Sequence, residues 1–198
     1  MRKLTLAAVA LTILVGRIQA DEVKAPTSPE DAAKAFAKAS QPGAEHKKLQ
    51  PLVGDWTYTC KCWMDPSKPP ITRTVTIQLR WMLGGRFISE KVVGTGFDGK
   101  PGSFEGYGVL GYDNALKKYT MSFICNAGTG TSTGTGTVKS DGTFTFESAC
   151  SCPLENKTIQ GRDVIRIVNK NKVIMTSYKI AGDKEIKGME IIAIRKKK

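Results

Sequence analysis

The amino-acid sequence predicts an all-β protein, an antiparallel up-and-down β-barrel of about ten strands with an N-terminal helix. From Asp55 onward, apolar and polar residues alternate with a period of two, the pattern of strands with one buried face. Short turn signals separate the alternating segments. Connections this short indicate antiparallel neighbours, because parallel strands need long crossovers. A closed barrel also removes exposed sheet edges, which favours it over an open sheet.

The first twenty residues have the features of a secretory signal peptide. Arg2 and Lys3 precede an apolar run from Leu4 to Val15, and Ala20 is followed by acidic residues. The apolar run is shorter than the roughly 20 residues that a membrane-spanning helix needs. We therefore expect residues 1–20 to be removed, the protein to be periplasmic or secreted, and no stable membrane anchor to remain.

An N-terminal helical segment is expected over residues 21–54, before the barrel domain of residues 55–198. Ser28 suits the N-cap of a helix, Pro29 suits its first turn, and Asp31 completes a capping pattern. This helix is expected to end near Ser40. A second short helical piece is expected before Pro51.

Ten segments with strand periodicity follow. They are residues 55–63, 71–83, 86–96, 103–112, 117–125, 129–139, 142–149, 157–168, 172–180 and 186–195. Within 129–139 every odd position up to Thr137 is threonine, with glycine or serine between. A glycine-lined face leaves room for a ligand or lets another backbone approach closely, and both interpretations stay open.

The alternation places all five cysteines on the apolar faces of their strands. These residues are Cys60, Cys62, Cys125, Cys150 and Cys152. Odd-numbered strands of such a barrel run in the same direction, so the ends of the first, fifth and seventh strands are predicted to bring the cysteines to one rim.

Two kinds of cysteine chemistry fit this pattern. An exported protein favours at least one disulfide, between the first and last pairs. The alternative is a periplasmic metal-binding or thiol-redox protein, in which the five thiols form a site for Zn²⁺ or Cu(I).

The net charge of +12 does not by itself indicate a nucleic-acid partner. The basic residues are scattered, except for the run from Arg195 to Lys198, and no basic helix or aromatic RNA-binding motif accompanies them. We expect a solvated basic surface and no nucleic acid.

The chain from about Glu45 to Lys196 resembles a bacterial family of unknown function, domain-of-unknown-function family 1579. The resemblance rests on His46 with Leu49, Leu52, Gly54 and Trp56; Trp63-Met64-Asp65-Pro66; Leu83-Gly84-Gly85-Arg86-Phe87; Gly106 with Gly111-Tyr112-Asp113; Lys117-Lys118-Tyr119; Gly134-Thr135; and the stretch from Lys184 to Ile191 with Arg195. It implies a lipocalin-like or fatty-acid-binding-like barrel, often exported, with no established activity.

Little in the sequence indicates catalysis. His46 is the only histidine, and it precedes the strands, where it is expected to be structural. No histidine occurs in a predicted strand, so haem would lack an inward histidine as its axial ligand. Glu105 and Glu147 are predicted to face outward, whereas the face of Glu90 is not determined by its neighbours. We therefore expect that the protein is not an enzyme.

The predicted function is binding of a small apolar or amphipathic ligand inside the barrel. Inward aromatic residues would form the apolar wall, and an arginine would meet an acidic group on the ligand. The predicted ligand-binding residues are Trp56, Tyr58, Arg73, Arg86, Phe123, Phe144 and Phe146.

Overall fold

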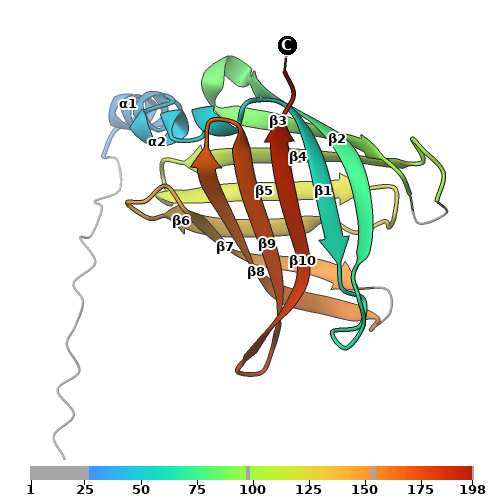
Figure 1. Cartoon of the computed structure of the whole chain (residues 1–198). Helices are drawn as coiled ribbons and strands as arrows, with labels where there is room; N and C mark the ends of the chain where they lie inside the picture. The colour runs from blue at the N-terminus through green and yellow to red at the C-terminus, as the bar shows by residue number, and fades with distance from the viewer. Residues whose placement is uncertain (1–26, 97–98, 153–154, 198) are drawn as a thin grey trace, which may run out of the picture. The chain divides into compact units, whose positions relative to one another are not determined.

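The computed structural model of the chain describes residues 27–96, 99–152 and 155–197. Ten strands form one closed antiparallel barrel, in which each strand pairs with its neighbours in the chain and β1 pairs with β10 (Figure 1). The predicted fold class is confirmed. The predicted signal peptide lies outside the described residues.

The strand bounds follow the predicted segments closely. The strands are β1 (Gly54–Cys62), β2 (Ile71–Met82), β3 (Phe87–Gly94), β4 (Phe104–Asp113), β5 (Lys118–Cys125), β6 (Ser132–Val138), β7 (Phe144–Cys152), β8 (Lys157–Asn169), β9 (Lys172–Ala181) and β10 (Lys184–Arg195). The largest difference is in β7, which continues through Cys150 and Cys152 and does not end before them.

The helical elements before the barrel are α1 (Pro29–Ala39), α2 (Ala44–Lys47) and η1 (Gln50–Leu52), a 3₁₀ turn; a further 3₁₀ turn, η2 (Leu83–Gly85), follows β2. The predicted cap of α1 is present, because the backbone N–H of Asp31 donates to Ser28 Oγ at 3.1 Å. Contacts separate the chain into two units between Phe36 and Ala37, within α1.

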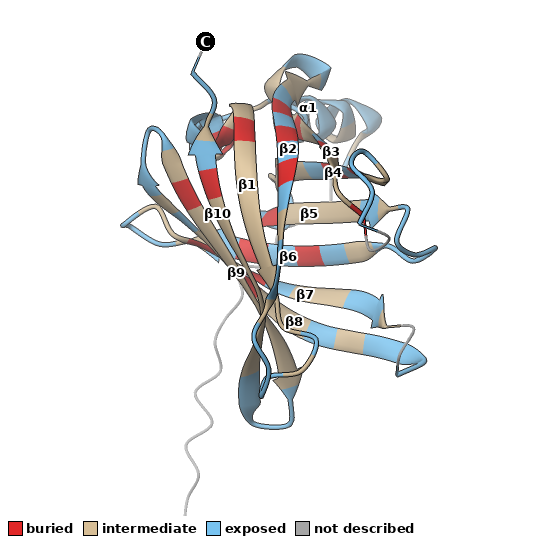
Figure 2. Ribbon diagram, turned by 45° about the vertical axis from the view of Figure 1, so that its right-hand side comes forward, coloured by how far each residue is buried: buried red, intermediate tan, exposed pale blue. Residues whose placement is uncertain are grey.

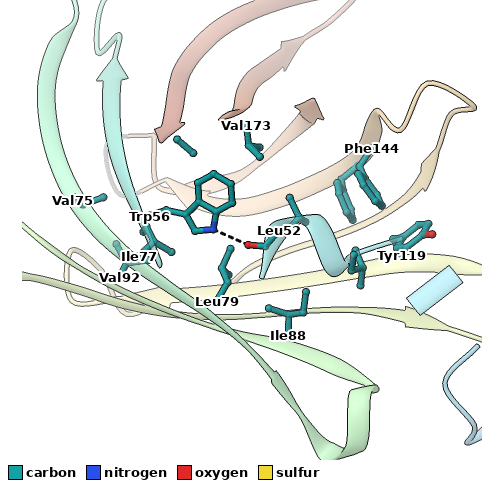
Figure 3. Packing of buried hydrophobic residues seen from close by; sticks show 13 residues of the cluster. Leu52, Trp56, Val75, Ile77, Leu79, Ile88, Val92, Tyr119, Phe144 and Val173 are labelled. Carbon is teal, nitrogen blue, oxygen red and sulfur yellow. Dashed lines mark hydrogen bonds between the residues drawn. The ribbon is translucent and has the colours of Figure 1, made fainter. Parts of the chain in front are cut away.

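Residues of α2 and η1 cover one end of the barrel, which we call the closed end. Leu49 and Leu52 are buried in the same apolar cluster as inward residues of the strands, and Figure 3 shows Leu52 among them. The indole N–H of Trp56 donates to the Leu52 carbonyl at 2.8 Å. At the opposite end, which we call the open end, β1 finishes at Cys62 and β2 begins at Ile71.

Arg195 ties the last strand to the closed end. Its guanidinium donates to the carbonyls of Val53 at 2.6 Å, Pro51 at 2.7 Å and Lys170 at 2.7 Å, and it stacks on the Trp56 ring with its Cζ 4.1 Å from the ring centroid. One side chain therefore holds the chain entry into β1, the β8–β9 turn and β10 together.

The glycines of β6 let neighbouring groups approach closely. A Cβ on Gly136 would come within 2.2 Å of the Thr145 carbonyl and 2.8 Å of the Phe146 ring, and one on Gly134 would lie 3.1 Å from Met121. The space above these glycines is therefore occupied by protein atoms. Close approach is the correct interpretation of the glycine face, and the alternative of ligand room is wrong at these two positions.

Candidate functional site

Burial of the inward residues differs between the two ends of the barrel. Near the closed end they are fully buried: Trp56 is 1%, Phe144 1% and Phe146 0% exposed. In β1, β2 and β10 the buried segments lie toward the end at which the described C-terminus lies (Figure 2). Farther along β1 the inward Tyr58 and Cys60 remain partly exposed. Inward side chains that keep solvent contact indicate that protein atoms do not fill this half of the interior.

The predicted ligand-binding residues therefore separate into groups. Trp56, Phe144 and Phe146 fill the core at the closed end. Tyr58 and Phe123 point inward and stay half-buried, as lining residues would. The structure thus gives a packing role to the first three and leaves Tyr58 and Phe123 available to a ligand.

The two predicted arginines lie at opposite ends of the barrel. Arg73 stands near the start of β2 at the open end, faces inward opposite Cys60, and donates to the Thr95 carbonyl at 3.3 Å. Arg86 precedes β3 at the other end and donates to the Leu83 carbonyl at 3.0 Å. They therefore cannot serve one small ligand together.

Arg86 instead borders a separate pocket of about 270 Å³ beside His46 and Tyr112. His46 is buried, and its Nδ1 accepts the backbone N–H of Gly43 at 3.1 Å. Burial lowers the pKa of His46. Its ring packs edge-on against Tyr112, with 5.7 Å between centroids. The imidazole is held as a structural group, in agreement with the sequence prediction.

Glu90 is the functional candidate that the sequence did not reveal. In the barrel register it pairs with Leu79 on one side and Gly108 on the other, and Gly108 pairs with Phe123. Paired residues of neighbouring strands share a face, so Glu90 points inward with Leu79 and Phe123. A carboxyl group therefore lies inside the apolar wall.

The Glu90 carboxylate has no partner among the residues that the structure describes. Among the described residues it makes no hydrogen bond and no ion pair, and they contain no fully buried side-chain oxygen or nitrogen without a partner. Its oxygens therefore keep some contact with solvent inside the barrel. Burial raises the pKa of Glu90 to about 7. The Glu90 carboxyl group can therefore be protonated or ionised near neutral pH.

Tyr58 adds a second polar group to the same interior. Burial raises the pKa of its phenol well above the usual range, and the charge of Glu90 adds to that shift. The hydroxyl therefore stays protonated and can donate a hydrogen bond. With Phe123 and Glu90 it gives the pattern of a small-molecule site, an apolar wall with a few polar groups.

Cys60 and Cys62 share the inward face of β1 near the open end, with their Sγ atoms 3.4 Å apart. With Cys60 as the donor of the hydrogen bond between the two thiols, that bond and the nearby Arg73 guanidinium lower the pKa of Cys62 to about 7. The same hydrogen bond and burial raise the pKa of Cys60. In this arrangement one thiol ionises readily and the other retains its proton.

The other three cysteines do not join this pair in a metal site. Cys125 ends β5, and Cys150 and Cys152 lie on β7. Within the described part of the chain, no three His, Cys, Asp or Glu side chains are arranged to hold a metal ion. All five cysteines lie in the described part of the chain, and the predicted five-cysteine cluster is not present there.

The predicted disulfide is also not formed in the structure, where all five cysteines are free. The barrel order explains this result. Three strands, β8, β9 and β10, separate β7 from β1 on the shorter path around the barrel. A disulfide requires Cα atoms roughly 4.4–6.8 Å apart, whereas each neighbouring strand adds about 4.8 Å.

No helix in the described part of the chain combines the length and apolarity that crossing a membrane requires.

Comparison with known proteins supports the fold. No curated protein matches the sequence. Among solved structures, the chain is similar to the crystal structure of Rv2717c from M. tuberculosis, with a TM-score of 0.54 and 15% identity. That similarity covers 79% of this chain and 100% of the other, and at this identity it shows the fold alone. Residues 41–195 match the family model described as a protein of unknown function, DUF1579, and the chain belongs to that family.

Proposed function

We propose that the half-open interior of the barrel binds a small amphipathic molecule. Its apolar body would lie against Tyr58 and Phe123, and its polar head would meet Glu90. The observation that carries the proposal is the Glu90 carboxyl group, which faces inward, has no partner among the described residues and has a pKa raised by burial to about 7.

The chemistry of Glu90 favours particular head groups. An ionised carboxylate accepts hydrogen bonds and attracts a cation, so an amine or hydroxyl head would satisfy it. An acidic head would place a like charge beside it, and like charges in a low-dielectric interior repel strongly. We therefore propose a neutral or basic head at Glu90, in place of the acidic one that pairing with arginine alone would imply.

Arg73 does not reverse this preference. It lies nearer the open end, opposite Cys60, and its guanidinium already contacts the Thr95 carbonyl. A ligand whose apolar body fills the space beside Phe123 would meet Glu90 first, because Phe123 and Glu90 both flank Gly108. Arg73 would then contact the outer part of a longer ligand.

We further propose that the protein is an exported carrier and not an enzyme. The support for export is the pattern of residues 1–20. The support for binding without catalysis is that His46, the single histidine of the chain, is held at the closed end and is not placed beside Glu90.

The test is native mass spectrometry of protein purified without detergent, followed by solvent extraction and mass analysis of any small molecule released. Wild-type protein is expected to carry a ligand of one chemical class with a neutral or basic head. Glu90→Gln is expected to carry less of it, whereas Glu147→Gln, on the outer face of β7, is expected to match wild type. Wild-type protein repeatedly free of any small molecule, or a Glu90→Gln variant loaded like wild type, would contradict the proposal.

A further inference from the structure

The two cysteines at the end of β1 are arranged as a reacting pair. Successive same-face residues of a strand are separated by about 6.6–6.8 Å along the chain, yet the sulfurs of Cys60 and Cys62 approach to 3.4 Å. Both side chains therefore lean toward each other over Lys61. Neither sulfur is bonded to another cysteine.

The surroundings of the pair distinguish its two members. Cys60 lies between Ile191 and Arg73 on the neighbouring strands. Cys62 lies between Met189 and Ile71, at the rim. The Arg73 guanidinium stabilises a thiolate at either position, either thiol can donate to the other, and Cys62 is the member at the rim. A thiolate that is partly exposed, close to a cation and next to a second thiol has the features of oxidant-sensitive cysteines.

We propose that Cys62 and Cys60 form a hydroperoxide-reactive thiol pair at the open end of the barrel, with Cys62 as the attacking thiol and Cys60 as the resolving one. This inference is independent of the ligand site at Glu90, because it rests on different residues and a different chemistry.

The proposed reaction consumes one hydroperoxide. The Cys62 thiolate attacks one peroxide oxygen, the O–O bond breaks, and the leaving hydroxide takes a proton to become water, so that Cys62 becomes a sulfenic acid. The Cys60 sulfur then attacks the Cys62 sulfur, the S–O bond breaks, and a second water leaves with the Cys60 proton. The two sulfurs together lose two electrons, which the peroxide gains, and a Cys60–Cys62 disulfide remains.

The backbone near Cys62 can accommodate the bond. The spacing of same-face residues on a strand lies at the upper limit of the roughly 4.4–6.8 Å that a disulfide allows between Cα atoms, so β1 must shorten slightly. On the partner strand β10, the pairing with β9 is irregular between Lys187 and Met189, and Met189 lies opposite Cys62. The end of a strand beside such an irregularity can deform at lower cost than its centre.

The test treats fully reduced, folded protein with a small excess of hydrogen peroxide, blocks the remaining thiols and digests with trypsin. Lys61 lies between the two cysteines, so cleavage there leaves peptides 49–61 and 62–73, which stay together only through a Cys60–Cys62 bond. Wild-type protein is expected to lose two of its five thiols and to give this joined pair. Thiol loss that spares the pair, or joined peptides that contain Cys125, Cys150 or Cys152 in place of one member, would overturn the proposal.

Serine variants separate the two roles. In Cys60→Ser, dimedone is expected to label Cys62 as a trapped sulfenic acid, and in Cys62→Ser the rapid thiol loss is expected to disappear. The matched control is Cys150→Ser, since Cys150 is the most exposed of the five, and it is expected to react like wild type. If Cys150→Ser abolishes the rapid loss while Cys62→Ser retains it, exposure alone governs the reaction and the pair has no special role.

Discussion

The carboxylate of Glu90 lies over Gly108 across the β3–β4 pair. A Cβ on Gly108 would come within 2.6 Å of Glu90 Oε2, and also 3.2 Å from the Phe123 ring. The glycine thus leaves the room that an inward carboxyl group needs. This relationship connects the wall of the barrel to the proposed ligand site.

The stability of the Glu90→Gln variant relative to wild type is expected to be greater at alkaline pH than at acidic pH. Burial raises the pKa of Glu90 from 4.5 to about 7, so between these values the folded protein holds a proton that the unfolded chain has lost. The free energy of unfolding of wild type therefore falls over this range, by about 3 kcal/mol in all. The Gln variant has no carboxyl group at this position, so its free energy of unfolding does not fall for this reason.

Urea denaturation at pH 4.5 and pH 8 measures the effect. The difference in unfolding free energy between Glu90→Gln and wild type is expected to move in favour of the variant by roughly 2–3 kcal/mol between the two pH values. Glu147→Gln, exposed on the outer wall, serves as the control and is expected to show no such movement. A pH-independent effect of Glu90→Gln would mean that its carboxyl group is solvated like an ordinary one.

Substitution of Gly108 by Ala is expected to destabilise the barrel by about 1–3 kcal/mol, because the added methyl overlaps the Glu90 carboxylate and lies 3.1 Å from the Ser122 carbonyl. The double variant with Glu90→Ala is expected to recover part of this loss, giving a coupling energy above about 0.5 kcal/mol. Gly128→Ala is the matched control, since a Cβ at Gly128 would meet no heavy atom of a non-adjacent residue within 4 Å. Strict additivity of the two substitutions would show that the carboxylate does not occupy the space above Gly108.

Arg195→Lys is expected to destabilise the protein by about 2–4 kcal/mol although the charge is kept. An ammonium cannot reach the carbonyls of Pro51, Val53 and Lys170 together while stacking on Trp56, as the guanidinium does. Urea denaturation measures the loss, and Arg166→Lys, exposed on β8, is the control. Equal stability of the two variants would contradict the role given to Arg195.

Export predicts that the protein is shortened when it is made in its own host or in a bacterium with a secretory pathway. Intact mass analysis of the periplasmic or secreted fraction is expected to give a chain that begins at Asp21. A protein that keeps Met1 and stays in the cytoplasm would contradict the predicted signal peptide.

The fold could be predicted from the sequence because nearly every strand alternates clearly between an apolar and a polar face. In β2, for example, Val75, Ile77 and Leu79 are buried while Thr76 and Gln78 are exposed. The end of β7 was predicted too early because Ser148 to Cys152 contains only small and weakly polar residues, and there hydrogen bonding to β8 decides the strand length.

The candidate site was harder to predict than the strands. Glu90 was not assigned because β3 carries apolar residues on both faces, with Ile88 and Val92 inward and Phe87 and Val93 on the other face. Only the register with β2 and β4 resolves the two faces. By contrast, the sequence alone could have predicted that Arg73 and Arg86 lie far apart, because successive antiparallel strands begin at opposite ends of a barrel.

The three core aromatics show why an inward position is a weak guide to ligand contact. Trp56, Phe144 and Phe146 do point inward as predicted, but η1 brings Leu52 in among the core residues (Figure 3). Alternation gives the direction of a side chain. It does not tell which end of the barrel the N-terminal segment fills.

Binding of three ten-carbon probes that differ only in the head group tests the central claim most directly. Decylamine, decanol and decanoate are titrated into wild type, Glu90→Gln and Glu147→Gln at pH 8 and below their micelle concentrations, with calorimetric detection. Wild type and the Glu147→Gln control are expected to bind the amine most tightly and the carboxylate least. In Glu90→Gln the ratio of the affinity for the amine to that for the carboxylate is expected to fall at least about tenfold, or 1.4 kcal/mol. Equal affinities for all three probes, a preference unchanged by Glu90→Gln, or binding of none of them would contradict the assignment of the barrel interior around Glu90 as the ligand site.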